Sequence, residues 1–164
     1  MTDVSNVPWA SVGFLLSQLG SANARWFHDT LVPLGIEPRQ FAILRFVSEE
    51  EGRSQQALGE ALGIAPSRMV ALIDELEERG LVERRPNPSD RRARALHVTA
   101  DGRRLLAAAM KRALAHEAQL CDPLKPKERQ TLIELLQRVA AGQGLIPGVH
   151  PELRTGESPL EHDE

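Results

Sequence analysis

The chain has 164 residues, of which 41% are hydrophobic and 26% are charged, and its formal net charge is −3. This balance is typical of a soluble globular domain with a real core, and no run of about 18 apolar residues indicates a membrane span. Because residues 1–4 lack the features of a signal peptide and a lone Cys121 excludes an internal disulfide framework, we expect a cytoplasmic protein.

The N-terminal part of the chain shows helical periodicity. Apolar residues recur at steps of three and four over residues 9–34, which predicts a helix that ends near Pro33 and Gly35. A second helix is expected to begin at Pro38, since proline is favourable in a first turn. This helix should end in the acidic stretch at residues 49–51.

Two shorter helices follow. Ser54 is a suitable N-cap for a helix over residues 55–62, which Gly63 would end. A helix over residues 66–79 should stop at Gly80. It carries an apolar stripe at positions i, i+3, i+4 and i+7, formed by Met69, Leu72, Ile73 and Leu76.

After Gly80 the pattern changes to one typical of strands. Residues 81–85 and 94–98 predict two short strands, joined by a segment over 86–90 that is rich in turn-forming residues. Between residues 84 and 104 there are seven arginines against two aspartates, so positive charge gathers here despite the negative total.

The C-terminal part predicts two more helices. Thr99 should cap a long helix that runs to about Cys121, and Pro126 should begin a last helix that ends at Gly142. Residues 144–164 hold three prolines and net negative charge. We therefore expect them to form a loosely ordered acidic tail.

The two helices at 55–62 and 66–79 form a candidate helix-turn-helix. The second helix would place its small, polar N-terminal end in the DNA major groove, and the arginines of the hairpin would contact the phosphates or a narrow minor groove. An ordinary helical hairpin with a solvated charged surface is the alternative. The candidate DNA-binding residues are Ser54, Gln55, Pro66, Ser67, Arg68, Ala71, Arg85, Asp90, Arg91, Arg92 and Arg94.

Three stretches carry a resemblance to a known family. They are residues 54–64 (Ser-Gln-Gln-Ala-Leu-Gly-Glu-Ala-Leu-Gly-Ile), residues 76–84 (Leu-Glu-Glu-Arg-Gly-Leu-Val-Glu-Arg) and residues 90–102, where Asp-Arg-Arg is followed by Thr-x-x-Gly. In this order they resemble the multiple antibiotic resistance regulator (MarR) family. The resemblance implies a mainly α fold with a small β-hairpin wing, in which a winged helix-turn-helix domain is embedded in a helical dimerisation domain.

The resemblance also implies a division of the chain. Residues 9–37 and 105–143 would form the dimerisation region, and residues 38–104 the DNA-binding domain. Arg92 would reach the minor groove while Asp90 braces an arginine. A symmetric dimer would bind double-stranded DNA at a pseudo-palindromic operator with half-sites about one helical turn apart. Repression is the common mode of this family.

Family members often respond to small molecules. The resemblance suggests a pocket lined by Phe14, Trp26, Phe27, Phe41 and Arg45 for an aromatic or amphipathic effector, although an aromatic core would give the same pattern. We expect no cofactor and no metal site, because the histidines lack ligand spacing. Cys121 is expected to be a buried structural thiol and not a redox sensor.

Two other functional classes compete with a DNA-binding regulator. An enzyme is disfavoured because the sequence has no nucleophile elbow, phosphate-binding glycine loop, metal motif or paired carboxylates in a glycine-flanked context, so we expect no catalytic residues. A winged helix protein-interaction module that has lost DNA binding remains the alternative. Such a module should expose large apolar groups in place of Ser67, Arg68 and Ala71.

Overall fold

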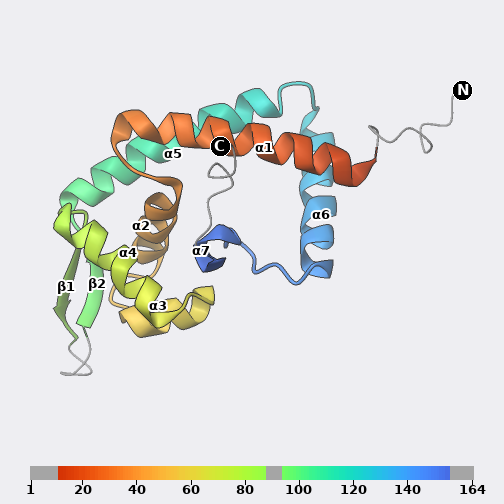
Figure 1. Cartoon of the computed structure of the whole chain (residues 1–164). Helices are drawn as coiled ribbons and strands as arrows, with labels where there is room; N and C mark the ends of the chain where they lie inside the picture. The colour runs from red at the N-terminus through yellow and green to blue at the C-terminus, as the bar shows by residue number, and fades with distance from the viewer. Residues whose placement is uncertain (1–10, 88–93, 156–164) are drawn as a thin grey trace, which may run out of the picture.

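The computed structural model describes residues 11–87 and 94–155 and shows a mainly helical chain with one antiparallel hairpin (Figure 1). This confirms the expected fold class. The elements are α1 (Val12–Leu31), a 3-10 turn (Val32–Leu34), α2 (Pro38–Glu49), α3 (Gln55–Leu62), α4 (Pro66–Glu78), β1 (Val82–Pro86), β2 (Arg94–Val98), α5 (Ala100–Leu120), α6 (Pro126–Gly142) and α7 (Glu152–Thr155).

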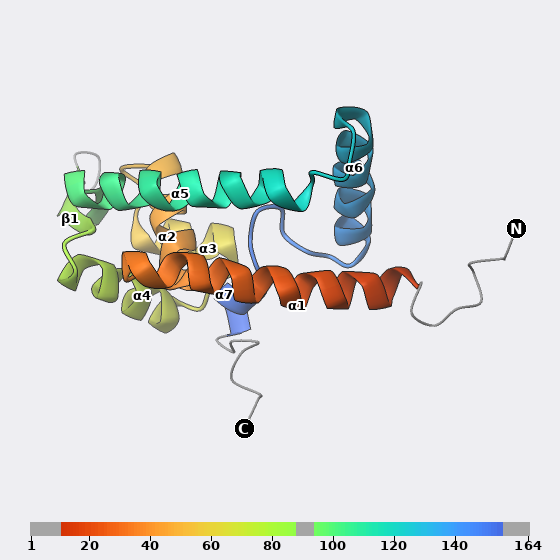
Figure 2. The same cartoon turned by 90° about the horizontal axis from the view of Figure 1, so that it is seen from above.

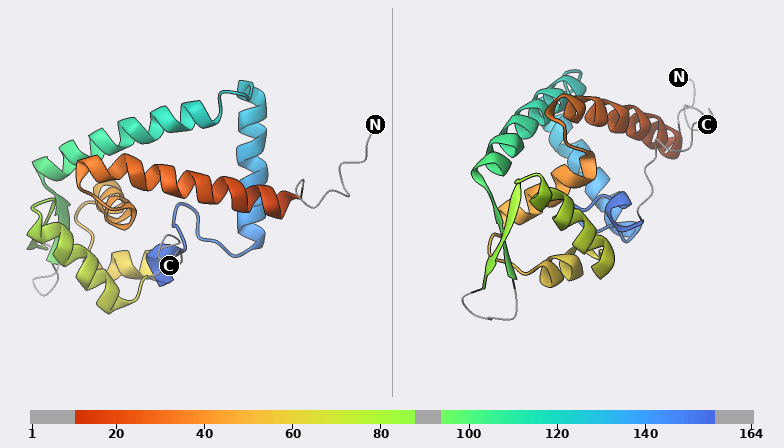
Figure 3. Two further views of the ribbon diagram at one scale, coloured as in Figure 1. Left: turned by 45° about the horizontal axis from the view of Figure 1, so that its top comes forward. Right: turned by 60° about the vertical axis from the view of Figure 1, so that its left-hand side comes forward.

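The long helices α1 and α5 run beside each other in opposite directions (Figures 1 and 2). One end of this pair carries the compact unit formed by α2, α3, α4 and the hairpin, and α6 crosses the other end (Figure 3). Within the described residues, none of the helices combines the length and the apolar character needed to cross a membrane.

The predicted helix starts rest on local capping. The Ser54 hydroxyl accepts from the Ala57 amide at 3.2 Å, and the Thr99 hydroxyl accepts from the Gly102 amide at 3.0 Å. Each hydroxyl satisfies one of the backbone donors that a helix leaves unpaired in its first turn. The predicted starts of α3 and α5 are therefore confirmed, as are the prolines that begin α2 and α6.

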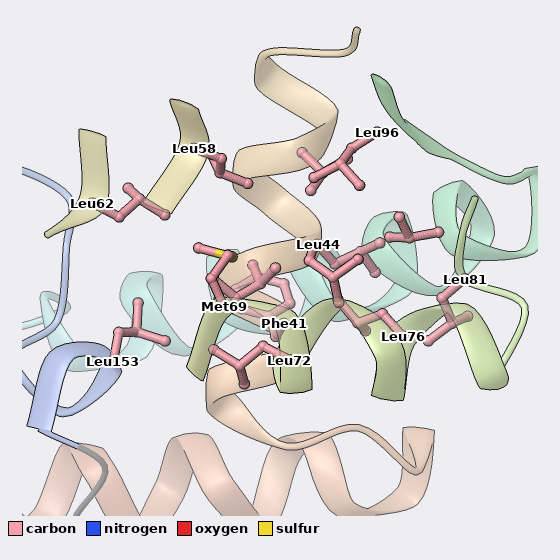
Figure 4. Close-up of a cluster of buried hydrophobic side chains, with 14 of the residues drawn as sticks. Phe41, Leu44, Leu58, Leu62, Met69, Leu72, Leu76, Leu81, Leu96 and Leu153 are labelled. Atoms are coloured by element: carbon pink, nitrogen blue, oxygen red, sulfur yellow. The ribbon is translucent and has the colours of Figure 1, made fainter. Parts of the chain in front are cut away.

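The core of the compact unit forms around α4. Met69, Leu72, Ile73 and Leu76 are all buried, as the predicted stripe requires. They pack with α2, α3 and the hairpin, and Figure 4 shows Met69, Leu72 and Leu76 among Phe41, Leu44, Leu58, Leu62, Leu81 and Leu96. Burial of one such side chain stabilises the fold by about 1.5–3 kcal/mol, so this contact fixes α4 on its neighbours.

A short segment before α3 extends the hairpin. Strands β1 and β2 pair in register from Val82 opposite Val98 to Pro86 opposite Arg94. On the other side of β2, Leu96 exchanges backbone hydrogen bonds with Arg53 and Gly52, each at 2.9 Å. The hairpin is thereby attached to the start of α3 as well as to α4.

The C-terminal segment differs from the expectation of a loosely ordered tail. Over residues 144–155 the chain folds back, and Val149 and Leu153 are only 8% and 2% exposed. The tail expectation is wrong for this part, because Val149 and Leu153 belong to the core of the compact unit and Ile146 packs against it. The remainder, 156–164, lies outside the described residues.

Large apolar side chains lie exposed on the three outer helices. In the single chain, Val12 and Leu19 on α1 are 68% and 55% exposed, and Leu114 on α5 is 63% exposed. Helix α6 has no buried residue and exposes Leu132, Ile133, Leu135, Leu136 and Val139.

Gly102 in the first turn of α5 leaves no room for a side chain. A Cβ there would clash with the Leu81 carbonyl oxygen and would lie 2.8 Å from Val98 Cγ1. We predict that Gly102→Ala lowers the free energy of unfolding by about 1–3 kcal/mol, the usual cost of overpacking. Urea unfolding at fixed protein concentration measures this effect. Gly13→Ala is the control, because nothing lies within 4 Å of its Cβ position; equal stabilities for both variants would contradict the prediction.

Candidate nucleic-acid interface

The N-terminal end of α4 is presented to solvent. Pro66, Ser67 and Ala71 are exposed, while the apolar face of the same helix is buried. Among the described residues, no side chain caps this helix start. Its free amides and the helix dipole therefore favour an anionic group such as a phosphate.

The two predicted residues at the start of α3 have structural partners. The Ser54 hydroxyl caps α3, and the side-chain Oε1 of Gln55 accepts from Arg84 Nη2 at 2.8 Å. The Ser54 hydroxyl thus stabilises the start of α3, and the Gln55 side chain joins α3 to strand β1 of the hairpin.

Arg84 on β1 is a site residue that the sequence-based prediction missed. Its Nη2 donates to Asp74 Oδ1 at 2.6 Å, its Nη1 pairs with Glu77, and its backbone amide donates to Glu77 Oε1 at 3.0 Å. Because Asp74 and Glu77 lie on α4, one guanidinium joins strand β1 to α4. Strand alternation could have revealed it, since Arg84 shares the inward face of β1 with buried Val82.

The electrostatics of Arg84 favour its charged form. Burial of the guanidinium lowers its pKa, but the hydrogen bonds and negative charges of Asp74 and Glu77 outweigh this, so that the pKa is raised overall. Arg84 therefore remains a cation whenever the two carboxylates are ionised, and the link between wing and helix is not lost by titration of the arginine.

Arg85 and Arg94, the other hairpin arginines within the described residues, point outward. The side chain of Arg85 is 53% exposed and forms an ion pair with Glu83 on its own strand. Arg94 is exposed at the other end of the register. Asp90, Arg91 and Arg92 lie outside the described residues.

Arg68 at the first turn of α4 is half-buried. Its Nε donates to the Leu153 carbonyl at 2.9 Å and its Nη2 donates to the Glu152 carbonyl at 3.3 Å. A residue predicted to contact DNA thus contacts the C-terminal segment of its own chain.

The predicted effector residues are only partly brought together. Phe27 and Phe41 make an edge contact with ring centroids 5.5 Å apart, while Trp26 stacks on His116 and Phe14 is exposed. Arg45 pairs with Glu49 on its own helix. A separate surface cavity of about 410 Å³, lined by none of these five, lies between the α3–α4 turn and the C-terminal segment.

Cys121 is half-buried at the end of α5. Burial and the neighbouring Glu117 carboxylate raise the pKa of the thiol, although Arg129 opposes this. A raised pKa leaves less of the reactive thiolate at neutral pH, which fits a structural thiol. Over 11–87 and 94–155, no three histidine, cysteine, aspartate or glutamate side chains gather as metal ligands.

The fold and this site define a winged helix-turn-helix transcriptional regulator. A family model described as MarR family matches residues 34–93. A MarR-family regulator from Rhodococcus sp. RHA1 is 34% identical with a TM-score of 0.67, covering 83% of this chain and 96% of that one.

Two further relatives, CouR and HosA, are also transcriptional regulators. CouR from Rhodococcus jostii RHA1, solved with p-coumaroyl-CoA, is 34% identical with a TM-score of 0.68 over 85% of this chain and 96% of its own. CouR bound to a 23-mer DNA duplex is 33% identical with a TM-score of 0.70 over 83% and 99%. The regulator HosA of Escherichia coli O111:H- is 30% identical over 71% of this chain and 84% of its own. The chain belongs to the MarR family, whose named relatives here are regulators of transcription and not enzymes.

Neighbouring arginines on β1 allow a matched test of the site. We predict that Arg84→Ala lowers the free energy of unfolding by about 1–2 kcal/mol, because it removes charge-assisted hydrogen bonds whose carboxylate partners are partly solvated. Arg85→Ala should change stability by less than about 0.5 kcal/mol. Urea unfolding of both variants measures the difference, and a stability loss for Arg85→Ala equal to that of Arg84→Ala would show that the two residues are not distinct in role.

Proposed function

We propose that this chain binds a pseudo-palindromic operator in double-stranded DNA as a homodimer. The observation that carries the proposal is the outward, uncapped N-terminal end of α4, held on a rigid core beside an arginine-bearing hairpin. Pro66, Ser67 and Ala71 would face the bases, and Arg85 and Arg94 the phosphates. The CouR structure with a DNA duplex supports this use of the fold.

The homodimer is proposed from the exposed apolar faces of α1, α5 and α6. An apolar surface spread over three helices is unusual for a monomer and indicates an association site. Symmetric dimers are the commonest oligomers, and a two-fold axis would relate the two α4 helices. Residues 9–37 and 105–143 would thus supply the dimerisation region, and residues 38–104 the DNA-binding domain.

Helix α6 offers a test of the dimer. We predict that the purified chain has twice its own mass of 18.1 kDa in sedimentation. Leu135→Glu should shift the equilibrium to monomer, since an unpaired carboxylate buried at an interface costs several kcal/mol. Gln137→Glu, at an exposed polar position on the same helix, is the charge-matched control. A dimer that Leu135→Glu leaves intact would place the interface elsewhere.

Repression relieved by a small molecule is the proposed regulatory mode. CouR is described as a repressor and was solved with p-coumaroyl-CoA, which supports an aromatic or amphipathic effector here. The contact of Phe27 with Phe41 and the nearby Trp26 supply aromatic surface at the junction of α1, α2 and α5. An effector should raise the melting temperature of the protein and weaken its operator complex.

The operator proposal is tested by fluorescence anisotropy on the protein's own promoter region against a scrambled duplex, over a salt series. We predict sequence-dependent binding that weakens steeply with salt. Arg92→Ala should weaken the free energy of operator binding by about 1–3 kcal/mol, as expected for a groove-inserted arginine. Arg85→Ala should reduce the slope of log binding constant against log salt concentration by about one.

Two negative outcomes of the anisotropy test lead to different conclusions. Equal, weak binding to both duplexes would require a genome-wide selection of bound fragments to find an operator elsewhere. An empty selection would reject DNA binding and favour a winged helix that contacts protein.

A further inference from the structure

The C-terminal strap, defined here as residues 145–155, returns from α6 to the helix-turn-helix and ends in α7 (Figures 1 and 3). Leu153 and Val149 belong to the hydrophobic core cluster, and Ile146 packs against it. Figure 4 shows Leu153 facing the side chains of α3 and α4. The strap is therefore seated on the DNA-binding unit by apolar anchors four residues apart.

Three arginines tie the strap down by hydrogen bonds to backbone carbonyls. Arg45 Nη2 on α2 donates to Gly148 O at 3.0 Å. Arg154 Nε in the strap donates to Gly63 O, in the turn between α3 and α4, at 3.3 Å. The third is Arg68, which donates to the carbonyls of Leu153 and Glu152.

The contact between Arg68 and the strap would compete with a contact between Arg68 and DNA. Arg68 occupies the first turn of α4, where a phosphate would also be favoured by the helix dipole. Because Nε and Nη2 of Arg68 already donate to the strap, a phosphate can take the two-pronged contact to this pair of nitrogens only by displacing these carbonyls. The Glu152 and Leu153 carbonyls in the first half of α7 and a DNA phosphate are therefore competing acceptors for Nε and Nη2 of Arg68.

We propose that the strap is an intramolecular competitor of DNA, which holds Arg68 in an occupied state and must release it when operator binds. This inference rests on the proposed DNA-binding function of α4. The apolar anchors keep the strap seated in the free protein, and the carbonyl–guanidinium contacts are exchanged for phosphate contacts in the complex. The full chain therefore binds operator more weakly than the same chain without the strap.

Two truncations separate the strap from the acidic residues that follow it. Operator affinity is compared for the full chain, for residues 1–155, which keep the strap, and for residues 1–144, which lose it. Residues 1–144 should bind at least about fivefold more tightly than residues 1–155, a change of about 1 kcal/mol. A matching gain already present in residues 1–155 would assign the effect to the acidic residues and overturn the strap proposal.

Because residues 1–144 lack the core residues Val149 and Leu153, the truncation also lowers stability. A second measurement therefore adds the strap back as a separate peptide. A synthetic peptide of residues 145–155, added to residues 1–144, should weaken operator binding again. A peptide with Leu153→Asp, which removes the buried anchor, should not. If both peptides act alike, or neither acts while residues 1–144 remain folded by circular dichroism, the strap is not a competitor.

Hydrogen exchange on the full chain provides the direct observation. The Val149, Leu153 and Arg154 amides are bonded within the strap to Ile146, His150 and Pro151 carbonyls. Operator DNA should speed their exchange, whereas unchanged or slower exchange would overturn release. Absence of DNA binding in every form of the chain would instead reject the proposed function itself, so the two failures are distinguishable.

Discussion

The packing of α4 on the rest of the compact unit is the contact on which the structure depends. Its buried stripe, from Met69 to Leu76, fixes the helix against α2, α3 and the hairpin. Two polar contacts also fix the orientation of α4. Gln40 on α2 donates to Glu75 at 3.0 Å, and Arg84 on β1 donates to Asp74. With one face so occupied, the start of α4 can only face outward, and the wing is held beside it.

A second constraint is the apolar surface that a single chain leaves in water. Helices α1, α5 and α6 extend beyond the compact unit, and their exposed apolar faces would be costly in water unless the proposed second chain covered them. Dimerisation would then set the spacing of the two α4 helices. The outer helices would then determine how far apart the two α4 helices lie along the DNA, and the compact unit of each chain would make the contacts with DNA.

Much of the fold could be predicted because its determinants are local. Ser54, Thr99 and Pro38 mark helix starts by capping and backbone geometry that a few neighbouring residues define. The C-terminal strap could not be predicted, since Val149 and Leu153 lie among prolines and acidic residues. Their burial depends on packing against residues of α3 and α4 that are distant in the sequence. The same holds at the site: the exposed end of α4 was evident, whereas the partners of Arg68 and Arg84 arise only from tertiary contacts.

In the proposed complex, the start of α4 enters the major groove in both halves of a dimer. A DNA-cleaving iron chelate attached at Ser67→Cys, in a Cys121→Ser background, tests it on an operator fragment. We predict two cleavage centres about 10–10.5 base pairs or a multiple apart, related by the pseudo-two-fold axis of the site. Uniform cleavage, or a single centre at saturating protein, would contradict it.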